Sequence, residues 1–268
     1  FDWSTEFSDQ TGADLRLYEF SYAHGGTRFE PLRWQVGRFL HHDMPEFGLL
    51  DGIEVGYRRE NGDRLGASFG YLPELDDDLD SLADLEIAGW YEWNQDIAER
   101  WSIAVGYQKS WHRFEEDRDL FVLRTRWLPL EGWTLSSTLW IDYYTGSDAL
   151  KSATVEVTRA NLFLGRRWQR AGLELFADHE AYPELLRQEL PQTIQPLTLR
   201  DAHQDRVSLH AYTPAGDSVR AFTRLTGWVD ESREGGAVEL GFDIEGLLQR
   251  RTTTTLAGFD VQGLTSSV

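Results

Sequence analysis

The chain has 268 residues, of which 45 are acidic and 26 are basic, for a formal net charge of −19 at pH 7. Binding to a phosphate backbone requires a basic face, so this charge excludes nucleic acid as the expected partner. The absence of cysteine excludes a disulfide framework and a thiolate metal site, and no apolar run approaches the roughly 18 residues of a transmembrane helix.

Alternation of apolar and polar residues is the dominant pattern along the chain. Within residues 51–58, for example, Ile53 and Val55 alternate with glycine and charged residues. Such alternation indicates a strand, since successive side chains point to opposite faces. The pair Asn61-Gly62 between two such runs predicts a tight hairpin turn. In chain order, the pattern predicts strands at 13–23, 31–38, 51–59, 64–72, 83–94, 99–113, 119–128, 132–145, 153–168, 171–180, 205–213, 217–230, 236–248 and 251–263.

These segments predict an all-β fold in which residues 1–268 form one domain. We expect a single antiparallel transmembrane β-barrel of about 14 strands, within a range of about 12 to 16. Several segments exceed the roughly 5–6 residues of a soluble strand and match the roughly 9–11 of a spanning strand. The 11 Trp and 10 Tyr favour a membrane, because such side chains concentrate at its interfaces. A soluble β-sandwich or lipocalin-type barrel is the alternative that the pattern leaves open.

One strand-loop-strand stretch carries a family resemblance. Val36-Gly37-Arg38 closes one strand and Leu49-Leu50-Asp51-Gly52 opens the next, and a glycine-rich strand follows up to Pro73. Over residues 31–74 this pattern resembles porin-like outer-membrane barrels related to the bacterial alginate exporters, with Arg38, Asp51 and Gly52 as its motif residues. The resemblance implies an outer-membrane barrel with passive transport activity, and it does not identify alginate as the solute.

The C-terminal end departs from the usual pattern of outer-membrane barrels, which commonly end in an aromatic residue. The chain ends in Gly263–Val268, and Phe259 is its last aromatic residue. We therefore expect either an added tail or a sequence that continues beyond this end.

Charged residues on the expected inward faces carry most of the functional information. Opposed arcs and rings of charge set ion selectivity in channels. A loop at 181–204 is expected to narrow the lumen, while a lumen filled by paired charges is the alternative. We expect Arg124, Arg126, Arg220 and Arg224 to face Glu54, Glu86, Glu174 and Asp178 across the lumen.

Three short motifs suggest other chemistry, and each has a simpler interpretation. Gly66–Gly70 matches the G-x-S-x-G pattern of a hydrolase, but that motif needs a strand-to-helix turn and here it lies within an expected strand. Asp76–Asp80 offers clustered carboxylates for calcium, but it lacks the EF-hand pattern and is better explained as a solvated loop. The run His41-His42-Asp43 would ligate a metal only on a bent loop.

A lipid-modifying enzyme of the outer membrane is the weakest alternative. Ser110 and Ser208 each lie two positions before a histidine, His112 and His210. Same-face neighbours at that spacing occur in any strand, so we expect no catalytic residues, cofactor or metal.

The sequence therefore predicts a porin-like channel for passive diffusion of small hydrophilic solutes or ions in the outer membrane of a Gram-negative bacterium. The lipid bilayer is the expected partner. A barrel that anchors or sheathes a partner in an outer-membrane complex is the second hypothesis. A homo-oligomer, or a complex with outer-membrane or periplasmic proteins, is compatible with both hypotheses.

Overall fold

The computed structural model describes residues 19–73, 82–96, 98–129, 132–144, 155–183, 185, 203–230, 234–245 and 253–256. These residues form thirteen strands of six to fourteen residues, a four-residue strand, and one 3-10 turn, η1 (Pro45–Phe47). Among them, no helix is long and apolar enough to cross a membrane.

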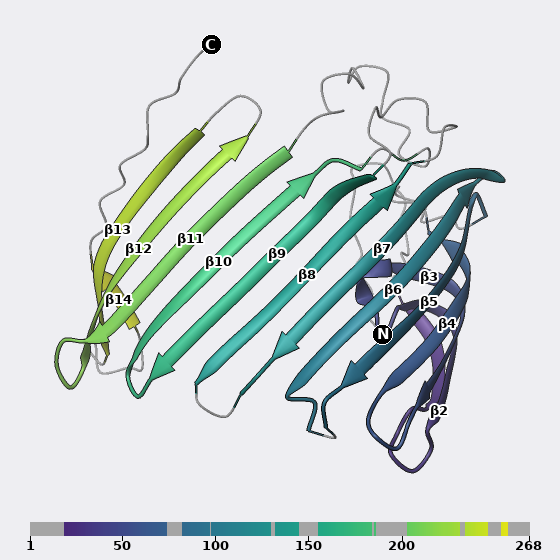
Figure 1. The fold of residues 1–268 in the computed structure, drawn as a ribbon, viewed down its shortest axis with the longest axis horizontal. Helices are drawn as coiled ribbons and strands as arrows, with labels where there is room; N and C mark the ends of the chain where they lie inside the picture. The colour runs from purple at the N-terminus through teal and green to yellow at the C-terminus, as the bar shows by residue number, and fades with distance from the viewer. Residues whose placement is uncertain are drawn as a thin grey trace, which may run out of the picture. The chain divides into compact units, whose positions relative to one another are not determined.

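The strands form an antiparallel sheet in which they follow one another in sequence order (Figure 1). The prediction of an all-β antiparallel fold is confirmed. Among the described residues, β1 and β14 each pair with one neighbour only, so the sheet is open and its closure into a barrel stays a prediction. The strands are β1 (Phe20–Gly25), β2 (Leu32–Leu40), β3 (Leu49–Arg58), β4 (Arg64–Leu72), β5 (Asp84–Asn94), β6 (Trp101–His112), β7 (Glu115–Trp127), β8 (Trp133–Tyr143), β9 (Val155–Trp168), β10 (Ala171–Ala181), β11 (His203–Pro214), β12 (Val219–Asp230), β13 (Glu234–Glu245) and β14 (Thr253–Leu256).

The chain divides into two compact units. The N-terminal unit comprises residues 1–123, 141–156 and 184–191, and the C-terminal unit comprises 124–140, 157–183 and 192–268. β1 to β6 belong to the first unit and β10 to β14 to the second.

In the N-terminal unit, the strand register sorts side chains onto two different faces. Val36 pairs with Ile53, Ile53 with Phe69, and Phe69 with Ile87, and all four side chains are exposed. Gln35, Glu54 and Ser68 are each the sequence neighbour of a residue in this row. They form a row on the opposite face, and all three are buried. The unit therefore has an exposed apolar face and a covered polar face.

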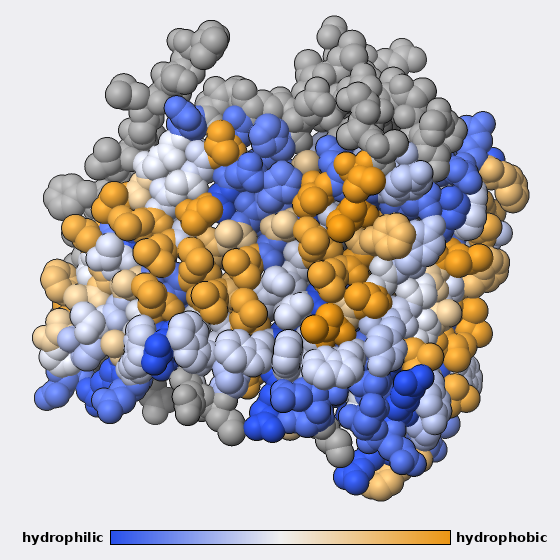
Figure 2. Space-filling model, in the orientation of Figure 1, coloured by the Kyte–Doolittle hydropathy of each residue, from blue (hydrophilic) through white to orange (hydrophobic). Residues whose placement is uncertain are grey.

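The C-terminal unit is sorted in the same way. Leu175, Leu209, Leu225 and Val238 form one cross-strand row. The adjacent row, on the opposite face, has Glu174, His210, Arg224 and Glu239. Figure 2 shows hydrophobic side chains gathered over the middle of this unit's strands, with hydrophilic residues toward the strand ends. An apolar band between polar margins is the pattern expected of a surface in contact with lipid.

Aromatic rings cover cross-strand glycines on the polar face. Trp90 pairs with Gly66 and Trp228 with Gly235, and a Cβ atom at either glycine would overlap the indole ring. These glycines allow a bulky side chain to lie flat against the neighbouring strand.

The turn that the sequence predicts at Asn61-Gly62 is present between β3 and β4. Gly62 has a positive φ of 97°, which glycine adopts without steric cost. The Asp63 carboxylate accepts hydrogen bonds from the Tyr91 hydroxyl at 2.7 Å and from the Asn94 backbone N–H at 2.9 Å. These bonds connect the turn to β5.

Connections of both lengths follow even-numbered strands: 41–48, 73–83 and 182–202 are long, whereas 113–114 and 231–233 have two and three residues. In the N-terminal unit, 41–48 and 73–83 are longer than 59–63 and 95–100. In the C-terminal unit, 182–202 is longer than 169–170 and 215–218. Because alternate connections lie at the same edge of an antiparallel sheet, the turns 169–170 and 215–218 share one edge of the C-terminal unit, here called its short-turn edge.

Candidate functional site on the polar face

Residues 41–48, here called the inner segment, fold over the polar face of the N-terminal unit. Gln108 on β6 donates a hydrogen bond of 2.9 Å from Nε2 to the backbone carbonyl of Phe47. The Phe47 and Met44 side chains fill the space above Gly106, and Met44 is fully buried. The inner segment is thus packed on the sheet.

His41, the first residue of this segment, lies between two carboxylates of the sheet. Its Nδ1 is 3.0 Å from Oε2 of Glu54 on β3, and its Nε2 is 3.2 Å from Oε1 of Glu86 on β5. All three side chains have no solvent exposure. Arg33 on β2 donates hydrogen bonds to Glu54 and to Gln35. Glu54 is therefore contacted by both His41 and Arg33, and Glu86 by His41.

The protonation of His41 follows from this geometry. Burial by itself lowers the pKa of an imidazole, but hydrogen bonds to Glu54 and Glu86 outweigh it and raise the pKa of His41 to about 9. His41 is accordingly an imidazolium at neutral pH and can donate from both ring nitrogens. The inner segment is held to the sheet by a buried, charge-assisted pair of contacts.

Of the residues predicted to line a lumen, the structure brings Glu54 and Glu86 together through His41. The side chains of Glu54 and Glu86 are both fully buried. The contacts of His41 and Arg33 with these acids were missed, because alternation alone does not show that 41–48 folds back onto β3 and β5. The signal available in the sequence was the adjacent pair His41-His42, a short distance after the Val36-Gly37-Arg38 motif.

On the polar face of the C-terminal unit, charged residues pair with neighbouring strands and are partly exposed. Arg224 donates to Glu239 at 2.8 Å, and Arg220 donates twice to Asp243 at 2.9 and 2.6 Å. His210 Nδ1 lies 3.2 Å from Oε2 of Glu174. The Arg220 and Arg224 side chains are 47% and 48% exposed, so both can meet a solute.

The remaining predicted residues are Asp178, Arg124 and Arg126. Asp178 pairs in register with Arg206 on β11. Arg124 and Arg126 lie on β7, half-buried and exposed respectively. The expectation that the arginines and acids of the predicted set face one another across a lumen stays a prediction.

The motif residues Arg38 and Asp51 form a cross-strand ion pair. Arg38 donates from Nε at 2.7 Å and from Nη2 at 2.6 Å to the two carboxylate oxygens of Asp51. Gly52 pairs with Gly37 and Gly70, and a Cβ on Gly52 would overlap the backbone of β4. The motif is therefore explained by strand pairing.

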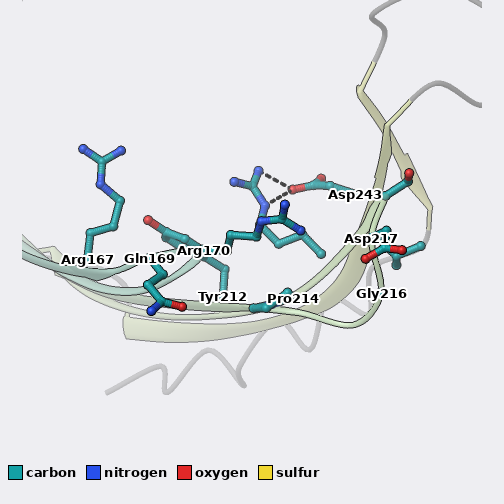
Figure 3. A pocket seen from close by; sticks show the side chains of 11 residues that line it. Arg167, Gln169, Arg170, Tyr212, Pro214, Gly216, Asp217 and Asp243 are labelled. Carbon is teal, nitrogen blue, oxygen red and sulfur yellow. Dashed lines mark hydrogen bonds and ion pairs between the residues drawn. The ribbon is translucent and has the colours of Figure 1, made fainter.

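A recess lies on the polar face at the short-turn edge of the C-terminal unit. It has a volume of about 340 Å³ and is lined by the turns 169–170 and 215–218 together with Arg167, Tyr212, Arg220 and Asp243. Figure 3 shows the Arg167 side chain extending away from the sheet, with Asp217 at the opposite end of the view. The recess was not predicted, because it depends on how the two turns are placed side by side.

The alternative motifs have the following positions. Ser68 lies within strand β4, as expected, and not at a strand-to-helix turn. Ser110 donates a hydrogen bond to Asp117, and Ser208 is hydrogen-bonded to Thr226. Among the described residues, neither hydroxyl forms a hydrogen bond with a histidine. Asp76–Asp80 and the centre of the 181–204 loop lie outside the described residues. Within the described part of the chain, no group of three metal-ligating side chains occurs.

Comparison of the chain with protein-family models gives no match, and comparison with curated proteins gives none either. Function is therefore inferred from the geometry of the two faces.

Proposed function

We propose that the chain is a transmembrane β-barrel of a Gram-negative outer membrane that provides a passive path for small hydrophilic solutes or ions. The observation that supports this proposal is the separation of the sheet into an exposed apolar face and a charged polar face. In a barrel, the first face contacts lipid and the second lines the lumen. A water-soluble sheet would bury the apolar face, whereas the exposed fractions of Val36, Ile53 and Phe69 are 45%, 44% and 50%.

The lengths of the strands and the aromatic residues at their ends also support membrane insertion. β5 to β13 have 11 to 14 residues, and a tilted spanning strand needs roughly 9–11. Near the short turns, Trp93 packs against Trp101 with ring centroids 5.4 Å apart. The Arg166 guanidinium lies 4.7 Å and 4.9 Å from the ring centroids of Trp133 and Trp168. Aromatic and basic side chains of this kind occupy membrane interfaces.

A solute path would run along the polar face of the C-terminal unit. Arg220, Arg224 and Glu174 are partly exposed there. In the N-terminal unit, Glu54 and Glu86 instead hold the inner segment. In this proposal the partly exposed charges set selectivity, and the buried ones keep the inner segment in place.

The packed polar face of the N-terminal unit favours a second function. A barrel that anchors or sheathes a partner does not need a water-filled path, and Met44, Phe47 and His41 fill the space above β5 and β6. The two functions differ in whether the reconstituted protein conducts ions.

Planar bilayer recording of the purified full chain tests the proposal. Stable conductance steps and a reversal potential in a salt gradient are expected from a channel. Arg224→Gln should shift the reversal potential toward cation selectivity, because it removes a positive charge from the polar face. Arg166→Gln is the matched control, because it removes the same charge from the opposite face and should leave the reversal potential unchanged. A correctly folded protein without conductance would favour the anchoring function.

A further inference from the structure

The recess at the short-turn edge of the C-terminal unit has more basic than acidic side chains in its lining, although the chain has a net charge of −19. Three guanidinium groups, those of Arg167, Arg170 and Arg220, line it together with the carboxylates of Asp217 and Asp243. No described acidic side chain forms an ion pair with Arg167 or Arg170. Two guanidinium groups are therefore available to a ligand.

The floor of the recess is ordered by contacts between neighbouring strands. The Tyr212 ring lies over Gly172, where a Cβ would overlap it. The Arg220 guanidinium stacks on this ring at 5.1 Å from its centroid while it donates to Asp243 at 2.6 Å. The third arginine is thus held in place without a ligand, which reduces the entropic cost of binding.

Of the other two arginines, Arg167 lies at the end of β9 and Arg170 in the turn that follows it. The backbone N–H of Arg167 donates to the carbonyl of Gly132 at 2.8 Å, which fixes the base of its side chain. Both side chains are exposed, so they can close on a ligand above Tyr212. Asp217 lies at the opposite end of the recess from Arg167 (Figure 3).

We propose that this recess binds a small oxyanion of the phosphate or carboxylate class, held by Arg167 and Arg170 above the Tyr212–Arg220 floor. Guanidinium groups donate paired hydrogen bonds that match the oxygens of both ligand classes. A volume of about 340 Å³ accommodates such a molecule with its hydration. The recess opens on the polar face, opposite Leu173 and Leu175 of the apolar face, so the ligand comes from solution and not from a lipid.

Isothermal titration calorimetry of the detergent-solubilised full chain with inorganic phosphate, at constant ionic strength, tests the inference. We expect a dissociation constant on the order of 1 mM or tighter. The double variant Arg167→Gln/Arg170→Gln should weaken binding by about tenfold or more, since each charge-assisted contact contributes about that factor. Arg206→Gln, a polar-face arginine outside the recess, should change it by less than about twofold. Absence of binding, or equal losses in both variants, would overturn the inference.

A second measurement uses the unmodified chain and does not depend on the folding of a variant. Phosphate should protect Arg167 and Arg170, but not Arg206, from phenylglyoxal, as read by mass spectrometry. The source of the anion is tested by comparing glycerol phosphate with a short-chain phosphatidylglycerol. Tighter binding of the lipid would contradict a solution ligand. Anion binding is measured in detergent and conductance in a bilayer, so the two proposals are tested separately. Absence of phosphate binding would not contradict the channel proposal, and absence of conductance would not contradict the binding site.

Discussion

His41 Nδ1 lies 3.0 Å from Glu54 Oε2, and neither side chain has any solvent exposure. Removal of one partner from a buried ion pair leaves an uncompensated charge, which costs about 3–5 kcal/mol. We expect His41→Ala to reduce the free energy of unfolding by about that amount, measured by urea unfolding in detergent with tryptophan fluorescence. The matched control is His42→Ala, since His42 is exposed and its replacement should have little effect. Equal effects of the two substitutions would show that the buried pair has no special role.

Stability should also depend on pH through His41. Its pKa is raised from 6.5 to about 9 in the folded chain, so the imidazolium contributes its full stabilisation below about pH 6.5 and loses it as the pH rises through about 9. The difference in unfolding free energy between the wild type and His41→Gln should therefore shrink from about pH 6 to about pH 10. A difference that stays constant over this interval would contradict a protonated His41 at neutral pH.

The packing of Trp90 on Gly66 predicts a size-dependent effect. A Cβ at Gly66 would overlap the Trp90 indole ring and the backbone oxygen of Val55, whereas a Cβ at Gly89 has its nearest neighbour at 3.7 Å. Gly66→Ala should cost about 1–3 kcal/mol and change the tryptophan emission, because the ring must move. Gly89→Ala should be close to neutral. A neutral Gly66→Ala would mean that the ring does not lie on this glycine in solution.

Arg38 and Asp51 should be energetically coupled. The two hydrogen bonds of 2.7 and 2.6 Å join side chains that are 18% and 23% exposed, and Lys cannot reproduce the paired geometry. A double-mutant cycle with Arg38→Lys and Asp51→Asn should give a coupling of about 1–2 kcal/mol in unfolding free energy. Additive effects of the two substitutions would contradict this pairing.

Local patterns predicted most of the strands. Alternation in 51–58 and 64–72 and the turn at Asn61-Gly62 depend only on residues close in sequence, and β3, β4 and their turn confirm them. The register between strands was not predicted, although a shift of one residue exchanges the two faces. For this reason the pairing of Arg220 with Asp243 became visible only in the structure.

The inner segment could not be predicted because its contacts are remote in sequence. Gln108 and Phe47, which join it to β6, are 61 positions apart. The 41–48 stretch has no periodicity that shows which surface it covers. Glu54 and Glu86 were correctly placed on the polar face, but their burial depends on this segment.

The most direct test of the two-faced barrel is cysteine labelling in liposomes, since the chain has no cysteine of its own. Ser208→Cys and Leu209→Cys place a thiol on adjacent residues of β11, on the polar and the apolar face respectively. We predict that a water-soluble maleimide labels the thiol at 208 and fails to label the thiol at 209 until detergent is added. Equal labelling of both thiols in intact liposomes would contradict a barrel whose apolar face contacts lipid.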